Sequence, residues 1–585
     1  MKKVLYGILS LAFLFACDME ELPKAEITSD PVFGTETGLQ MYTNSFYEVF
    51  PTTTSRYTIS NYIAVNQVIK YLTSNGFSPE ESSGWNWGTL RNINYFIVNC
   101  TDEALPAATR NNYLGVARFF RAYFYFDMMK RFGDLPWINH PLDVNDPLLH
   151  SVRDSRSLIA DSIKADLDFA IANIKTSKDA SCSTITSTVA AAMKSRVCLW
   201  EGTFRKYHAE AGLQSSANQW LQEAADAAQI VMNAGYSIYT GSGVYNSYRN
   251  LFISKSPVSA EVLYAVTFDS SLGVVHSSNR QWTSVTFGVC PSLVRPFVNT
   301  YLMLDGTSFT DQSDYATKSF TEECVNRDTR LAQTVRTPGF TRVTGGTTVK
   351  TPPNYAYAIT GYQTSKFTLD DTQYDNVDIC DNNVILFRYA EVLLNYAEAK
   401  AELGMLTNDD WTKTVGTLRA RAGITNGLTA KPTTIDSYLQ QTYFPAISDP
   451  TLLEVRRERS IELALEGFRY TDLLRWKKGE LMTQKWRGIY VKELNVPMDL
   501  DHDGALDVVF YQGTKPENLP STCVAVNVSA SETNQQGLSE GDHGYLTWSD
   551  NLPRYWYPDN RQYYYPIPSL VIVKNLNLEQ NPGWE

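Results

Sequence analysis

The stretch RRERSIELALEGFRYTDLLRW, residues 456–476, decides how this chain is interpreted, because it combines nine charged side chains with a repeating apolar stripe. Ile461, Ala464, Leu465 and Phe468 follow the i, i+3, i+4, i+7 spacing of one helix face. The stretch therefore predicts a helix. Its charges have two interpretations: a catalytic acid–base array, or contacts that hold helices together.

The spacing of these charges favours the structural interpretation. Opposite charges fall three positions apart on the expected helix, in the pairs Arg459–Glu462, Glu466–Arg469 and Asp472–Arg475. An arginine can clamp a carboxylate with two parallel hydrogen bonds. A general acid instead needs a raised pKa in an apolar pocket, whereas a nearby arginine favours the ionised carboxylate. We therefore expect these charges to hold helices together.

Two helical regions flank a loop-rich middle. Residues 37–235 carry apolar residues at helical spacing in five segments: 87–100, 112–133, 155–174, 187–204 and 218–235. Residues 236–385 are rich in Gly, Ser, Thr, Asn and Tyr, which predicts long loops with short strands. Helix returns in residues 385–480, where residues 388–423 resemble one tetratricopeptide unit. The sequence predicts a mainly α fold of helix pairs with an irregular part.

The N-terminal residues predict export and lipidation. Two lysines precede an apolar run, residues 4–15, which is too short to cross a bilayer and is typical of a secretory signal. The run ends in LFAC, residues 14–17, which resembles a bacterial lipobox. We expect a signal peptide over residues 1–16, a lipidated Cys17 and a tether over residues 17–36. The alternative is an ordinary signal peptide with a chance cysteine.

Composition and motifs exclude several classes of function. The net charge is −12, and no basic stretch alternates with aromatics, which argues against nucleic acid as a partner. The other seven cysteines never form a C-x-x-C pair, and no phosphate-binding or zinc motif is present. GLSEG, residues 537–541, matches G-x-S-x-G around Ser539, but polar flanks replace the strand and helix that a nucleophile elbow needs.

Seven blocks in order resemble the SusD/RagB-type outer-membrane lipoproteins of Bacteroidota. Besides residues 456–476 they are FFRAYFYFDMMKRFGDLPWI (119–138), SVRDSRSLIADSIKADLDFAI (151–171), LVRPFVNTYLMLDG (293–306), NRDTRL (326–331), RYAEVLLNYAEAKAELG (388–404) and YYYPIPSLVIVKNLNLEQNPGW (563–584). The acidic residues directly after Cys17 are similar to the export signal of surface-exposed members. The resemblance covers essentially the whole mature chain.

This resemblance implies a fold and a role. The fold is mainly α, an α-superhelix of tetratricopeptide-like helix pairs, with a SusD-like N-terminal region over 37–235 and a SusD/RagB C-terminal region over 236–585. The implied role is a lipid-anchored, cell-surface protein of the outer membrane that binds glycans, or in some members peptides. It would deliver them to a SusC-like TonB-dependent transporter. The alternative is a mostly helical glycoside hydrolase, which needs two carboxylates flanking the scissile bond.

Aromatic residues in polar stretches are the candidate ligand contacts, because sugar rings present C–H faces that stack on Trp and Tyr. Trp85, Asn86 and Trp87 lie in ESSGWNWGTL, residues 81–90, a region where the resemblance implies glycan contacts. Trp87 could instead pack against the helix that follows. Trp282 in SSNRQWTSV, and Tyr355 and Tyr357 in PPNYAYAI, are further candidates from the loop-rich middle.

An acidic loop predicts a cation site or a polar turn. In DLDHDGALD, residues 499–507, alternate carboxylates surround Gly504, as in the first part of an EF-hand calcium loop. The candidate ligands are Asp499, Asp501, Asp503 and Asp507. The twelfth position is Phe510, where an EF-hand carries Glu, so a solvated Asp/Gly turn remains the alternative.

Overall fold

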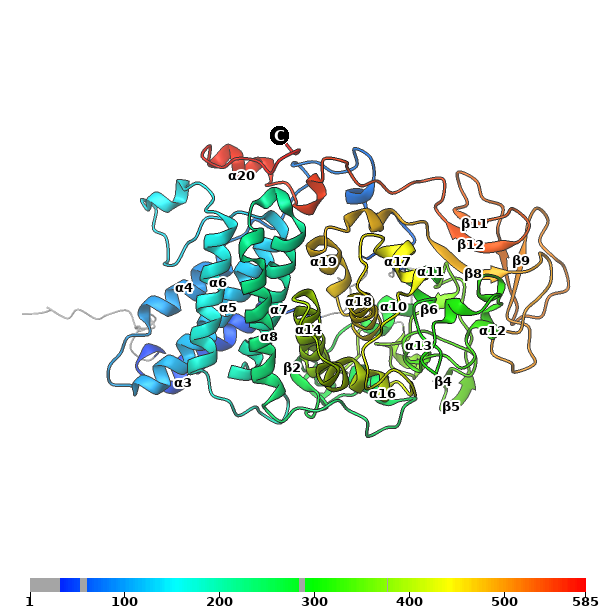
Figure 1. Cartoon of the computed structure of the whole chain (residues 1–585), viewed down its shortest axis with the longest axis horizontal. Helices are drawn as coiled ribbons and strands as arrows, with labels where there is room; N and C mark the ends of the chain where they lie inside the picture. The colour runs from blue at the N-terminus through cyan, green and yellow to red at the C-terminus, as the bar shows by residue number, and fades with distance from the viewer. Residues whose placement is uncertain (1–31, 53–59, 284–289, 376) are drawn as a thin grey trace, which may run out of the picture.

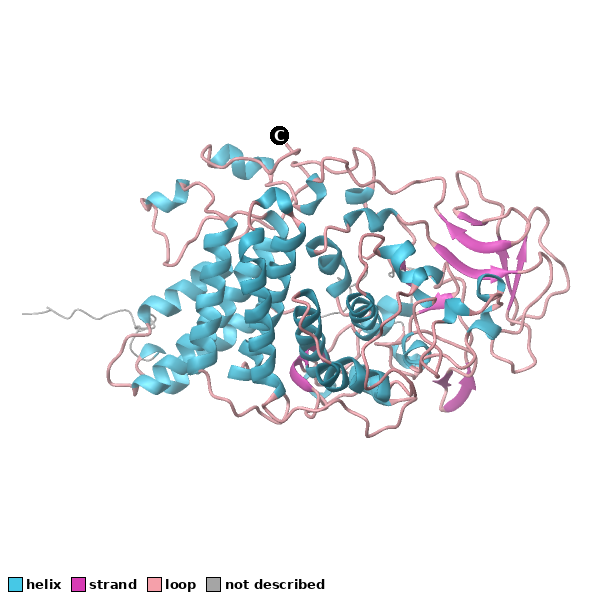
Figure 2. Cartoon of the chain, viewed as in Figure 1, coloured by secondary structure: helices cyan, strands magenta, loops and turns pink. Residues whose placement is uncertain are grey.

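The computed structural model describes residues 32–52, 60–283, 290–375 and 377–585. The expected signal peptide, Cys17 and most of the tether lie outside these residues. The described chain is mainly helical with small sheets, most of them at one end (Figure 2), which confirms the predicted fold class.

The five helices expected before residue 236 are all present as one packed layer (Figure 1). They are α4 (Gly88–Asn99), α5 (Ala107–Phe132), α6 (Arg156–Asn173), α7 (Ser187–Tyr207) and α8 (Ala217–Met232), with the short α3 (Glu36–Asn44) alongside. Side-chain caps begin two of them, Ser155 on α6 and Thr186 on α7. Gly133 ends α5 with a φ of 78°, a conformation that costs glycine little.

Helix α14 (Tyr389–Glu402) joins this layer to the C-terminal half, because it packs against α7 and α8 on one side and α18 (Pro450–Glu462) on the other. The second helix of the expected tetratricopeptide-like pair is present without a gap over residues 408–421, and a π-helical turn (Thr412–Gly416) lies between α15 (Asn408–Trp411) and α16 (Thr417–Arg421). A Cβ at Gly416 would lie 2.0 Å from the Leu428 carbonyl oxygen, so only glycine allows this approach.

The prediction of a single helix over residues 456–476 is wrong. Helix α18 ends at Glu462, and α19 (Phe468–Arg475) begins after a tight turn in which Leu465 and Gly467 have φ of 66° and 87°. Distant side chains satisfy the carbonyl groups that the break exposes: Tyr248 Oη donates to Glu462 O at 2.7 Å, and Lys366 Nζ donates to Ala464 O at 2.7 Å. Tertiary hydrogen bonds therefore replace the missing helical turn.

Short strands lie mainly at the other end of the molecule, and one two-stranded sheet lies beside α14 (Figure 1). The antiparallel sheets are β2 (Val262–Val266) with β7 (Val384–Arg388), the hairpin β4 (Thr341–Thr344) with β5 (Thr347–Lys350), the trio β1 (Ile63–Ala64), β3 (Ser292–Leu293) and β6 (Tyr362–Gln363), and β11 (Gln536–Leu538), β12 (Gly544–Trp548) and β8 (Arg487–Val491) in that order. One parallel pair joins β9 (Val508–Tyr511) to β10 (Val524–Asn527). Ser539 lies in the turn between β11 and β12, so the element that directly follows it is a strand and not the helix of a nucleophile elbow.

Two main cores support these layers. The first core lies among the N-terminal helices and includes Phe119, Phe120 and Leu199, all at most 1% exposed. The second core lies beneath the strands and includes Phe297 and Phe510. Hydrophobic burial on this scale is the main source of stability for both halves.

The C-terminal segment returns to the N-terminal helices (Figure 1). Tyr565 donates its main-chain N–H to Arg131 O at 2.8 Å, and Asn581 Nδ2 donates to Phe132 O at 3.0 Å. The Tyr565 ring stacks on Tyr71 with 4.2 Å between centroids. The segment that includes α20 (Ser569–Lys574) therefore covers the end of α5.

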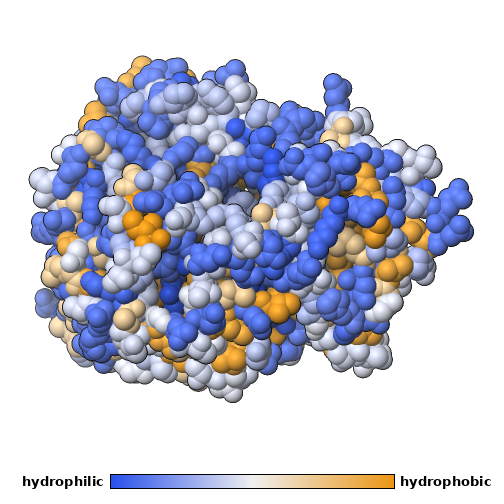
Figure 3. Space-filling view, turned by 45° about the vertical axis from the view of Figure 1, so that its right-hand side comes forward, coloured by the Kyte–Doolittle hydropathy of each residue, from blue (hydrophilic) through white to orange (hydrophobic). Residues whose placement is uncertain are grey.

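The face seen in Figure 3 is predominantly hydrophilic and carries separate apolar patches. Among the described helices, none has the length and apolar character needed to span a bilayer. The seven cysteines after Cys17 are all free thiols.

Candidate functional site

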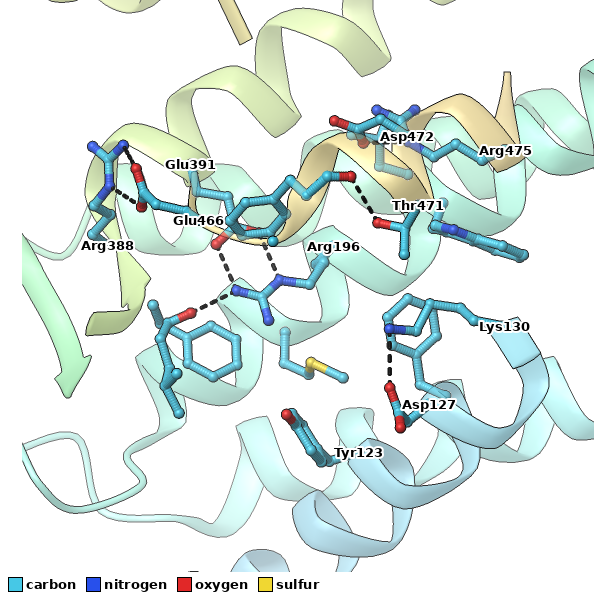
Figure 4. Close-up of a pocket in the computed structure, with 18 of the residues that line it drawn as sticks. Tyr123, Asp127, Lys130, Arg196, Arg388, Glu391, Glu466, Thr471, Asp472 and Arg475 are labelled. Carbon is cyan, nitrogen blue, oxygen red and sulfur yellow. Dashed lines mark hydrogen bonds and ion pairs between the residues drawn. The ribbon is translucent and has the colours of Figure 1, made fainter. Parts of the chain in front are cut away.

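A cavity of about 230 Å³ lies where the N-terminal helices meet β7 and α19 (Figure 4). Arg196 on α7 points toward Glu391 on α14 and donates to its two carboxylate oxygens at 2.6 and 2.7 Å. On another wall, Arg388 donates to Glu466 with two bonds of 2.7 Å. These charged side chains of the cavity thus form ion pairs with one another. The pairs join the elements around the cavity, which is a structural role.

A larger network of buried ion pairs continues from this cavity into α18 and α19. Glu462 accepts from three arginines on other elements: Arg330, Arg388 and Arg421. Glu398 accepts from both terminal nitrogens of Arg475, at 2.6 and 2.7 Å. These residues are at most 2% exposed, so each charge depends on its partners rather than on water.

The electrostatics of this network argue against a general acid at Glu398 or Glu462. Burial alone would raise the pKa of Glu398, but the charge and hydrogen bonds of Arg475 outweigh it and lower the pKa to about 2. Burial is likewise outweighed at Glu462, where Arg421, Arg388 and Arg330 hold the pKa well below its usual value. Both carboxylates stay ionised at neutral pH, so the charges of residues 456–476 hold helices together, as expected.

The pairing expected within the stretch was largely wrong. Only Asp472–Arg475 forms as predicted, at 2.9 Å. Arg459 pairs with Asp472 instead of Glu462, and Glu466 pairs with Arg388 and Lys366 instead of Arg469. Arg459 and Glu462 both lie on α18, but each pairs with residues of other elements. The turn after Glu462 places Glu466 before the start of α19, which carries Arg469. Sequence reasoning missed Arg330 and Arg388, although both stand in family-like blocks, NRDTRL and RYAEVLL.

Trp85 and Trp87 form an aromatic platform at the start of α4. Their rings meet edge to face with centroids 5.5 Å apart, and both rings are half-buried against the first core. Trp85 contacts Phe132 and Trp87 contacts Phe124, at 5.1 and 5.6 Å between centroids. Part of each indole is fixed by packing while another part stays accessible. Trp87 thus also packs on neighbouring helices, which was the alternative to a ligand contact.

A hollow of about 270 Å³ adjoins this platform. Trp87, Leu90, Ile138, Leu142 and Leu149 line its apolar side, and Gly88, Arg91 and His140 complete its lining.

Hydrogen bonds fix the polar rim of this hollow. Arg91 Nη1 donates to the Leu142 carbonyl, and His140 Nε2 contacts Asp146 Oδ2 at 2.8 Å. Asn86 is exposed, and its Oδ1 accepts from Gly88 N at 3.0 Å; its Nδ2 group is a donor that this bond does not use. An apolar floor with a few fixed polar groups is the usual chemistry of a small-molecule site.

The structure separates the other aromatic candidates from this platform. Trp282 is 2% exposed and stacks toward Phe367 in the second core, and Tyr355 is 8% exposed and packs edge to face on Phe510. The expectation that these two rings lie in open loops is therefore wrong, because tertiary packing buries them. Tyr357 is half-buried and remains accessible beside them.

Three of the four acidic candidates converge. Asp499, Asp501 and Asp507 each offer one oxygen, and these oxygens lie within 4.8 Å of one another. Asp503 is exposed and does not join them. Carboxylate oxygens are the ligands that Ca²⁺ and Mg²⁺ prefer, so this arrangement could hold a hard divalent cation.

Comparison with known proteins places this chain in a family. The family model described as "SusD family" matches residues 245–584, more than half of the chain, so the chain belongs to the SusD family. A search of curated proteins found no match.

Solved structures show the same fold along almost the whole chain. A SusD-like protein from Bacteroides fragilis superposes with a TM-score of 0.69 at 20% identity, covering 96% of this chain and 100% of that one. A SusD-like carbohydrate binding protein from the same species gives 0.66 at 18% identity, covering 94% and 100%. B. fragilis NanU gives 0.56 at 16% identity, covering 96% and 100%. These low identities establish a shared fold.

Proposed function

We propose that this protein binds a glycan at the Trp85–Trp87 platform and passes it to a SusC-like TonB-dependent transporter of the outer membrane. The observation that carries the proposal is the pair of half-buried indoles, one of which, Trp87, lines an apolar hollow of about 270 Å³. Indole faces match the C–H faces of sugar rings, and Asn86, Arg91 and His140 supply polar groups that orient hydroxyls. Carbohydrate binding in a B. fragilis relative of the same fold is consistent with this ligand class.

The proposed location is the cell surface, where the lipid on Cys17 anchors the protein to the outer membrane. The basis is the lipobox-like LFAC at residues 14–17 and the acidic residues after it. Several acyl chains on one cysteine give stable anchoring, which a single chain does not. An anchored binding protein needs a partner to move its ligand inward, and the transporter supplies that step.

Binding without bond cleavage is the proposed mode of action. The buried carboxylates Glu398 and Glu462 have depressed pKa values because arginines surround them, so neither can donate a proton near neutral pH. The platform itself contains rings and an amide but no pair of carboxylates that could flank a glycosidic bond. We therefore describe the protein as a receptor for glycan.

Isothermal titration against a panel of polysaccharides tests the proposal. We expect one class of glycan to bind the wild type and to bind Trp85→Ala and Trp87→Ala more weakly. Tyr245→Ala is the matched control, because Tyr245 is a 65% exposed aromatic away from the platform. Equal affinity in all four proteins would refute the platform. Release of reducing ends during the titration would favour the hydrolase alternative, and binding of peptides alone would replace glycan as the ligand class.

A further inference from the structure

The acidic loop at residues 499–507 presents three carboxylates to one point. Asp499, Asp501 and Asp507 each place an oxygen within 4.8 Å of the others. Main-chain N–H groups hold the flanking two: Asp499 Oδ2 accepts from Gly504 N at 3.0 Å, and Asp507 Oδ2 accepts from Leu500 N at 2.7 Å. Three negative side chains therefore lie together, and their mutual repulsion must be offset.

Asp501 provides an independent observation that points to a ligand. Its side chain is 2% exposed and directed into the cluster, and its Oδ2 has no hydrogen-bond partner among the described residues. Its Oδ1 accepts a single bond from Asp503 N, at 3.2 Å. A buried carboxylate oxygen without a partner is costly, since burial removes its water and nothing replaces it.

The neighbouring lysine does not satisfy this oxygen. Lys350 Nζ, at the end of β5, donates to the carbonyl oxygens of Asp501 and His502 at 3.0 and 2.9 Å. The ammonium group thus binds main-chain carbonyls on the outside of the loop and does not bind the inward-facing carboxylate of Asp501. A positive charge inside the cluster would balance the three carboxylates.

We propose that this loop binds a divalent cation, Ca²⁺, through the carboxylates of Asp499, Asp501 and Asp507. The donor set consists of hard oxygens with no imidazole or thiolate among them, which favours Ca²⁺ or Mg²⁺ over transition metals. Ca²⁺ fits better than Mg²⁺, because it accepts irregular geometry and takes further ligands from carbonyl oxygens and water.

The bound cation would organise this end of the molecule. The loop leads directly into β9, where Phe510 packs on Tyr355 in the second core. Through Lys350 the same loop holds the β4–β5 hairpin. Binding of Ca²⁺ would therefore fix β9 and this hairpin in place and raise the melting temperature by mass action.

The test uses the purified protein, stripped with chelator and titrated with CaCl₂ and then MgCl₂ by calorimetry. We expect one Ca²⁺ per chain, with a Kd between about 10⁻⁵ and 10⁻³ M, and weaker binding of Mg²⁺. Asp501→Asn should weaken Ca²⁺ binding at least tenfold. Asp503→Asn is the matched control: it removes the same charge from the same loop outside the cluster, and its affinity should change less than twofold.

Melting curves provide a second readout that does not depend on any variant folding well. Stripped wild type should gain melting temperature on addition of CaCl₂, and Asp501→Asn should not. In chelator, Asp501→Asn should melt no lower than the wild type, because it removes an unpaired buried charge. Absence of binding heat and of a melting shift in the wild type would overturn the proposal, as would equal losses of affinity in Asp501→Asn and Asp503→Asn.

Discussion

Arg475 donates hydrogen bonds from both terminal nitrogens to the carboxylate of Glu398, at 2.6 and 2.7 Å, across 77 positions of sequence. The pair joins α19 to α14, and Trp476 Nε1 adds a third bond to the same carboxylate at 2.7 Å. Both partners are almost fully buried. A buried pair of this kind costs desolvation when it forms, so its value lies in fixing which helices meet and in what register.

Arg475→Met should destabilise the protein by about 3–5 kcal/mol, because it leaves the Glu398 carboxylate buried without its main partner. Urea denaturation followed by circular dichroism measures the loss. Lys413→Met is the control, since Lys413 pairs with Asp409 on the surface at 2.6 Å and exposed pairs contribute little. A similar loss in both variants would show that the buried pair has no special role.

Stability should fall in acid. The pKa of Glu398 is lowered from 4.5 to about 2, so its contribution is complete above pH 4.5 and is lost as pH falls toward 2. Glu462, with a pKa held well below its usual value, acts in the same direction. Melting temperatures recorded from pH 7 to pH 3 should decline, and Glu398→Gln should start lower and decline less. A parallel decline in wild type and variant would contradict this assignment.

Trp85 and Trp282 should respond to substitution in opposite ways. Trp85→Ala should weaken glycan binding by about 1.5–3 kcal/mol, the range for burying one large apolar side chain, with little change in melting temperature. Trp282→Ala should instead cost about 3–5 kcal/mol of folding stability, because it empties part of the second core. Titration and urea denaturation of both variants separate the two roles; loss of stability in Trp85→Ala alone would reverse them.

Cys17 should be the lipidated residue of the mature protein. Cells grown with labelled palmitate should label the wild type and not Cys17→Ala, because the thiol of Cys17 is the acceptor in the lipobox-like segment. Cys523→Ala, which removes a thiol from the folded part, is the control and should stay labelled. Label in the Cys17 variant equal to that in the wild type would disprove the anchor.

The transporter should copurify with the protein from outer membranes solubilised in mild detergent. Affinity capture followed by mass spectrometry should identify a TonB-dependent transporter in near-equal amount, if delivery of the glycan requires a standing complex. Capture from cells that express Cys17→Ala tests whether the transporter binds the protein directly or is recovered only because both are anchored in the same membrane. Recovery of the protein alone in several detergents would count against the partnership.

Local patterns predicted the helices well, whereas long-range contacts decided the rest. Helices α4 to α8 follow apolar spacings that any short window reveals, and the convergence of Asp499, Asp501 and Asp507 follows from the turn chemistry of one loop. The partners of Glu462 come from positions 330, 388 and 421, which no local pattern connects. The break after α18 was missed for the same reason, because the groups that satisfy its carbonyls, on Tyr248 and Lys366, are also distant in sequence.

The aromatic candidates show the same limit. Trp282 and Trp85 both stand among polar neighbours in the sequence, so composition alone treats them alike. Burial separates them: Phe367 lies against Trp282 in the second core, whereas Trp85 sits at the edge of the first core. Whether a ring faces solvent depends on what packs over it, and that information is tertiary.

The return of the C-terminal segment to α5 has a consequence for the order in which the chain can be completed. Tyr565 and Asn581 bind the main-chain carbonyls of Arg131 and Phe132. These contacts of the first quarter of the protein can therefore form only after residues 565–581 have been synthesised. Closing a loop of that length carries an entropic cost that is offset only when the final segment docks. During synthesis the end of α5 therefore stays uncovered until residues 565–581 have left the ribosome, and a chain that stops short of residue 565 lacks these contacts.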